Sequence, residues 1–120
     1  MKEMTNENIF IEYKGQKYSL VFNMNVLETL QKKYGSFNNW TNLIQPTEKG
    51  EECDIEALKF VFCEAINEGI DIDNEDREEK QAFLTMKQTG RIITEIGLKE
   101  ANQKIHEAVI ESAKTEEKNA

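Results

Sequence analysis

The window from Val21 to Trp40, VFNMNVLETLQKKYGSFNNW, constrains the fold most, because it joins a strand end to two closely spaced helices. The first helix is predicted from Met24 to Tyr34, where apolar residues recur at helical spacing. Asn23 or Asn25 can accept a hydrogen bond from a free amide at its start. Gly35 supplies the left-handed residue that commonly ends a helix.

A second, short helix is predicted from Phe37 to Ile44, with Ser36 as its cap and Pro46 as its end. It carries four large apolar side chains, Phe37, Trp40, Leu43 and Ile44. These side chains either cover the neighbouring hairpin or contact another protein, and tryptophan is frequent in interface hot spots. Phe37, Trp40 and Leu43 are therefore candidate partner-binding residues.

The segment before this window predicts a β-hairpin. Residues 8–13 alternate between apolar and polar, and so do residues 17–22, with Lys14-Gly15-Gln16 as the turn between them. A lone hairpin is only marginally stable in water. We therefore expect its apolar face to dock on the helices that follow.

A third helix is predicted from Ile55 to Glu68, capped by Asp54 and stopped by Gly69. One broad face is apolar and indicates the central core helix, with Leu58, Val61, Phe62, Ala65 and Ile66. Phe60 and Cys63 fall instead on the polar side. This position predicts a second contact surface, for a partner or for self-association, and the alternative is a second buried side of the helix.

Thr85 and Gln88 form the pattern of a capping box and predict a fourth helix starting at about Met86. Its inward residues are predicted to be Met86, Ile92, Ile93 and Ile96. A last helix carries Leu98, Ala101, Ile105, Ala108, Val109 and Ser112 on one face. The two apolar stripes are rotated by roughly 150° if the helix is continuous, so we expect a break or sharp bend at Gly97.

These elements predict an α+β fold, with an N-terminal β-hairpin packed on a mostly helical single domain of about five helices. The domain is predicted to span residues 8–113. Residues 1–7 are predicted to be a flexible N-terminus, and residues 114–120 a polar, disordered tail.

The net charge of −8 is concentrated in two segments, residues 48–56 and 71–80, each with a net charge of −4. An acidic surface repels phosphate backbones and anionic lipid headgroups, so neither nucleic acid nor a membrane is a predicted partner. The sequence contains neither a long apolar run nor a signal peptide pattern, which predicts a cytoplasmic location. Cys53 and Cys63 would lie about 15 Å apart along a helix, too far for a disulfide unless Cys53 folds back from the helix start, so both are predicted to be free, reduced thiols.

Chemical motifs are weak. Asp71, Asp73 and Glu75 alternate as in a calcium loop, but Asp76 and Ala82 occupy the positions that require glycine and glutamate. A solvated acidic loop explains them better. The last two helices lack the basic face of a DNA-reading helix-turn-helix. The sequence therefore predicts a protein that is not an enzyme, with no catalytic residue, cofactor or metal ligand.

The order of parts resembles a known family. The hairpin EYKGQKYSLVF, the helix FNMNVLETLQKKYGS, Trp40, the helix DIEALKFVFCEAINEG and the segment GRIITEIG are together similar to tail assembly chaperones of long-tailed bacteriophages and Gram-positive prophages. The resemblance covers residues 8–113. It implies a protein that binds the apolar, helical tape measure protein, keeps it soluble and presents it to tail tube subunits. The tail tube protein and self-association are further implied contacts.

A second class of function fits the same sequence. A small acidic cytoplasmic adaptor or regulatory protein that binds an unrelated protein partner would also lack a chemical motif. Gene order separates the two, because a chaperone gene is expected between the tail tube and tape measure genes.

Overall fold

The computed structural model describes residues 9–45 and 53–119, with side chains placed as far as Lys114. The predicted flexible N-terminus, residues 1–7, and Pro46 lie outside the described residues. The elements in chain order are β1 Ile9–Tyr13, β2 Gln16–Leu20, α1 Met24–Tyr34, α2 Phe37–Ile44, α3 Ile55–Asn74, α4 Met86–Ile96 and α5 Leu98–Asn119. This confirms the predicted α+β fold with an N-terminal hairpin and a mostly helical domain.

The hairpin pairs β1 and β2 antiparallel, with Ile9 opposite Leu20 and Tyr13 opposite Gln16. Lys14 and Gly15 both have positive φ values, 53° and 77°. Two such residues form the tight turn whose twist matches that of paired strands. The predicted hairpin is confirmed, but its turn is one residue shorter, because Gln16 belongs to β2.

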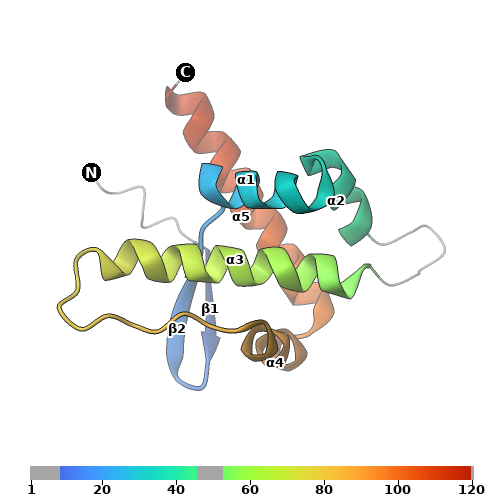
Figure 1. Cartoon of the computed structure of the whole chain (residues 1–120). Helices are drawn as coiled ribbons and strands as arrows, with labels where there is room; N and C mark the ends of the chain where they lie inside the picture. Colours follow the sequence, from blue (N-terminus) through green and yellow to red (C-terminus); the bar gives the residue numbers. More distant parts are fainter. Residues whose placement is uncertain (1–8, 46–52, 120) are drawn as a thin grey trace.

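Helix α3 is the central element (Figure 1). In this view α1 and α2 lie on one side of it, and the hairpin and α4 lie on the other. Contacts join α3 to all four of these elements, and α5 packs against both the hairpin and α3. The five residues predicted for the core face of α3, from Leu58 to Ile66, are all buried.

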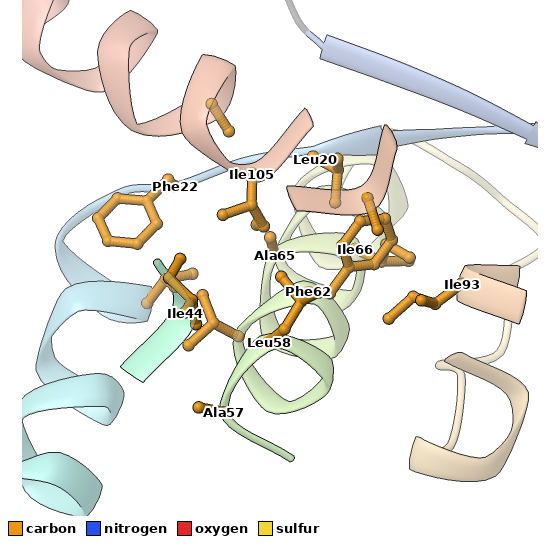
Figure 2. Close-up of a cluster of buried hydrophobic side chains, with 14 of the residues drawn as sticks. Leu20, Phe22, Ile44, Ala57, Leu58, Phe62, Ala65, Ile66, Ile93 and Ile105 are labelled. Atoms are coloured by element: carbon orange, nitrogen blue, oxygen red, sulfur yellow. The ribbon is translucent and has the colours of Figure 1, made fainter. Parts of the chain in front are cut away.

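Most of the core gathers around this face of α3. Figure 2 shows Ile105 of α5 next to Leu20 of the hairpin and Ala65 of α3, with Phe22 and Ile44 completing the cluster. The break predicted at Gly97 is confirmed, since Gly97 has φ 96° and separates α4 from α5. It allows both apolar stripes to face inward, with Ile92 and Ile93 on α4 and Ala101, Ile105 and Ala108 on α5 all buried.

The predicted helix caps are present. Asn23, Ser36, Asp54 and Thr85 each accept a hydrogen bond from a backbone amide in the first turn of the helix that follows. Gln88 completes the capping box with Thr85. Gly35 follows α1 with φ 92°, as a helix-ending glycine requires.

The prediction that Gly69 ends α3 is wrong. Helix α3 continues to Asn74, so Asp71 and Asp73 are helical rather than part of the predicted loop. A Cβ atom on Gly69 would lie 2.6 Å from Ser19 Oγ and 2.7 Å from Ser19 O. Gly69 is therefore needed for the close approach of β2. In sequence, a glycine with this role looks the same as a glycine that ends a helix.

Two further findings concern the helices. Helix α5 extends to Asn119, beyond Ala113, where the predicted domain ends. Within the described part of the chain, no helix combines the length and the apolar character needed to cross a membrane.

We expect Gly69→Ala to lower the free energy of unfolding by about 1–3 kcal/mol, the usual range for overpacking. The clash is with the Ser19 backbone, which cannot move without shifting β2. Gly90→Ala in α4 is the matched control, since its Cβ would meet only the flexible Lys59 side chain, at 3.3 Å. Urea unfolding should give a change below about 1 kcal/mol for this control. Equal stabilities for the two variants would contradict the proposed close approach.

Candidate functional site

Trp40, a predicted contact residue, lies in the core. Its side chain is 1% exposed, and its indole Nε1 donates a hydrogen bond of 3.1 Å to the Ala57 carbonyl oxygen in α3. Its ring stacks on Phe22, with centroids 6.2 Å apart. The interpretation that α2 covers the end of the hairpin therefore holds for Trp40, whose side chain offers no surface to a partner.

The two other candidates on α2 are more accessible. Phe37 is half-buried and contacts Phe22 edge-on, with centroids 6.1 Å apart. Leu43 is 39% exposed. The carbonyl groups at the end of α2 are held by tertiary hydrogen bonds, from the Asp54 amide to Leu43 O at 2.8 Å and from Asn102 Nδ2 to Ile44 O at 2.8 Å. Helix α2 is thus fixed to α3 and α5.

Phe60 projects from α3, and its side chain is half-buried against the end of α1. Its ring meets Tyr34 edge-on at 6.1 Å, and Lys33 Nζ lies 4.9 Å from the ring centroid. Tyr34 donates a hydrogen bond of 2.9 Å to Glu56 Oε1, and Lys33 pairs with the other oxygen of Glu56 at 3.3 Å. Burial, followed by this hydrogen bond, raises the pKa of Tyr34. The contacts of Phe60 with Tyr34 and Lys33 explain why an aromatic side chain lies on the polar side of α3.

Cys63 is buried, with 6% of its surface exposed. Asn67 Nδ2 lies 3.5 Å from its sulfur, and the Leu84 carbonyl oxygen lies 3.7 Å away. Burial raises the pKa of the Cys63 thiol, which keeps it protonated and weakly nucleophilic. No disulfide joins it to Cys53. Of the two residues predicted to form a second contact surface, Cys63 is covered by other parts of the same chain, and Phe60 is half-buried against Tyr34.

The cover over Cys63 is a return segment, residues 77–85, which runs back along α3 (Figure 1). Asn67 donates to Leu84 O at 2.9 Å and accepts from the Leu84 amide at 2.8 Å. Asn74 makes the same pair of bonds with Gln81, at 3.0 and 2.8 Å. The two side-chain amides, seven residues apart, thus each pair with the backbone N–H and C=O of one residue in the return segment, as the backbone of a neighbouring strand would. The sequence reasoning missed both asparagines, although their spacing places them on one face of α3.

A concave surface lies elsewhere, between the start of α3, helix α4 and the Gly97 corner. It is a groove of about 740 Å³ that is open to solvent and lined mainly by apolar atoms. Ile55 and Leu98 supply accessible apolar side chains, the buried Leu58 and Ile93 also line the groove, and so does Tyr13 of the hairpin. Lys59, Lys87, Arg91 and Glu95 supply the charged ones. We call this surface the α3–α4 groove.

Local sequence explains why this groove forms. Gly90 lets α4 approach the Lys59 side chain, because a Cβ atom there would lie 3.3 Å from Lys59 Cδ. Gly97 then turns the chain into α5 with a positive φ that glycine adopts readily. Ile55, the first residue of α3, is left 44% exposed at the groove. None of the five predicted contact residues, Phe37, Trp40, Leu43, Phe60 and Cys63, lines it.

Within residues 9–45 and 53–119, no group of three histidine, cysteine, aspartate or glutamate side chains is placed to hold a metal ion. Comparison of the chain with protein-family models, with curated proteins and with solved structures finds no match.

We expect Asn67→Asp to lower the free energy of unfolding by about 1–3 kcal/mol, because a carboxylate cannot donate to Leu84 O. Asn38→Asp on the exposed face of α2 introduces the same charge and should change stability by less than about 0.5 kcal/mol. Urea unfolding measures both. Equal effects would show that the pair of bonds to Leu84 does not hold the return segment.

Cys63 should react slowly with iodoacetamide in the folded chain at pH 8, roughly tenfold or more slowly than in urea, because it is buried and its pKa is raised. Peptide mass spectrometry after timed labelling distinguishes Cys63 from Cys53. Labelling of Cys63 as fast in the native chain as in the unfolded one would mean that the return segment does not cover it.

Proposed function

We propose that this protein is a phage tail assembly chaperone that binds the tape measure protein in the bacterial cytoplasm, keeps it soluble and helps recruit tail tube subunits. Two things support the proposal. One is the resemblance of its hairpin and helix order to that family. The other is the α3–α4 groove.

The groove is the observation that carries the proposal. Its accessible apolar side chains are Ile55 at the start of α3 and Leu98 at the start of α5, and Leu58 and Ile93, which are buried, lie beside them. Helical partners bind such grooves by an apolar stripe of residues spaced at i, i+3, i+4 and i+7. A long apolar helix carries this stripe along its whole length.

Binding in the groove would serve a chaperone well. An unassembled helix with an exposed apolar stripe is an aggregation liability. Covering the stripe removes it from water, while the open side of the groove leaves the rest of the helix accessible to tail tube subunits. The net charge of −8 on each chain makes the complexes repel one another, which opposes their aggregation.

Co-expression with the tape measure protein tests the proposal. We expect the unaltered chain to keep a tape measure fragment in the soluble fraction, and Ile55→Asp to lose this effect by placing a charge in the apolar groove. Ile110→Asp is the matched control, because Ile110 lies on α5 outside the groove and is 54% exposed. Both substitutions are at exposed positions, so circular dichroism should show an unchanged fold.

The opposite results would be decisive. If the chain never keeps tape measure fragments soluble, the chaperone proposal fails, and the adaptor class of function takes its place. If Ile55→Asp and Ile110→Asp both retain the activity, the binding surface is not the α3–α4 groove. The order of neighbouring genes gives an independent test, with tail tube and tape measure genes expected on either side.

A further inference from the structure

The charge around the α3–α4 groove is opposite to that of the whole chain. Lys59, Lys87 and Arg91 line it, against one carboxylate, Glu95. Among the described residues, none of these three cations has a carboxylate oxygen within 4.0 Å, whereas Lys32, Lys33, Arg77 and Lys114 do. Among the residues that the structure describes, the groove thus carries cations that no ion pair neutralises, on a chain with a net charge of −8.

The cationic edge continues past Arg91. Arg91 and Tyr13 also line a neighbouring polar hollow of about 290 Å³. Lys14 of the hairpin turn borders that hollow, with its Nζ 5.4 Å from the centroid of the Tyr13 ring. Gln88, one turn before Ile92 on α4, adds an amide there. Cations therefore follow the groove from α3 across α4 to the hairpin turn.

The Lys59 side chain lies along the surface of α4. This side chain is half-buried and lies across Gly90, with Cδ 3.3 Å and Nζ 3.6 Å from where a Cβ atom of Gly90 would be. A long side chain held along an apolar surface in this way keeps its ammonium group at the edge.

We infer that the α3–α4 groove binds a helical protein segment whose apolar stripe is flanked by carboxylates. This inference rests on the proposed function and specifies the chemistry of the tape measure segment that the protein takes. The apolar lining would cover the stripe, while Lys59, Lys87 and Arg91 would pair with acidic residues beside it. Complementary charge at the rim of an interface mainly provides specificity and fast association.

The net charge of the chain makes this arrangement selective. An acidic segment is repelled by a surface with a net charge of −8 except where the cations of the groove lie. A basic segment is attracted by the acidic surface, but the cations of the groove repel it. Repulsion of the wrong ligand is as effective a source of specificity as attraction of the right one.

Two synthetic peptides test the inference on the full chain. Both are helical, about 20 residues long, and share one leucine stripe, but glutamate flanks the stripe in the first and lysine in the second. Fluorescence anisotropy should show about tenfold or tighter binding of the glutamate peptide, and this preference should shrink at high salt. The double variant Lys87→Glu with Arg91→Glu should reverse the preference.

The control is Lys32→Glu with Lys114→Glu, which changes the net charge equally at exposed positions outside the groove. It should leave the preference for the glutamate peptide in place. All four substituted side chains are exposed, so the fold should be retained, and circular dichroism would show this.

Several outcomes would overturn the inference. These are equal binding of the two peptides, binding of neither peptide, and a preference that the Lys87 and Arg91 substitutions do not change. Tighter binding of a single-stranded oligonucleotide than of the glutamate peptide would assign the cations to phosphate instead. Light scattering that shows a dimer lost only in the double variant would make a second copy of the chain the occupant.

This result can be separated from the test of the proposed function. If the double variant still keeps tape measure fragments soluble while Ile55→Asp does not, the chaperone proposal stands and the inference about charge fails. If neither the unaltered chain nor any variant keeps the fragments soluble, the proposed function fails, whatever the peptides show.

Discussion

The close approach of β2 to α3 is the interaction on which the rest of the structure depends. The Val21 amide donates to the Ala65 carbonyl oxygen at 3.1 Å, and the Ser19 backbone passes Gly69 at a distance that leaves no room for a side chain. A two-stranded hairpin is marginal alone, so this contact with a long helix gives it a hydrophobic surface to cover. Strand β2 covers one side of the core, and α5 covers another side. Leu20, Ala65 and Ile105 pack together between these elements and α3 (Figure 2).

The same helix links the core to the groove. Its middle binds the hairpin, its far half binds the return segment through Asn67 and Asn74, and its first turn supplies Ile55 to the α3–α4 groove. The return segment leads the chain back along α3 to the start of α4 (Figure 1). The groove is therefore a consequence of how the core is closed, and its lining is held by packed helices rather than by loops.

Local signals in the sequence were sufficient for most of the fold. Asn23, Ser36, Asp54 and Thr85 act within one helical turn, so their side chains identify helix starts without knowledge of the tertiary structure. Gly69 shows the limit, since a glycine that ends a helix and one that admits a strand look alike in sequence. The spacing of Ile66 and Ile70, both buried, is the signal that α3 continues. The candidate site was harder to predict, because Phe60 and Cys63 face polar neighbours on α3 but are covered by residues distant in sequence, Tyr34 and Leu84. The groove joins residues from three separate segments of the sequence, and no single window contains it.

Hydrogen exchange of the complex between this protein and the tape measure protein tests whether the α3–α4 groove is the binding surface, because it locates that surface without substitutions. We expect slower exchange in the complex than in the free chain for the first turns of α3, Ile55 to Lys59, and for α4 through Leu98, with α1 and α2 unchanged. Protection confined to α1 and α2, or no change at α4, would contradict it.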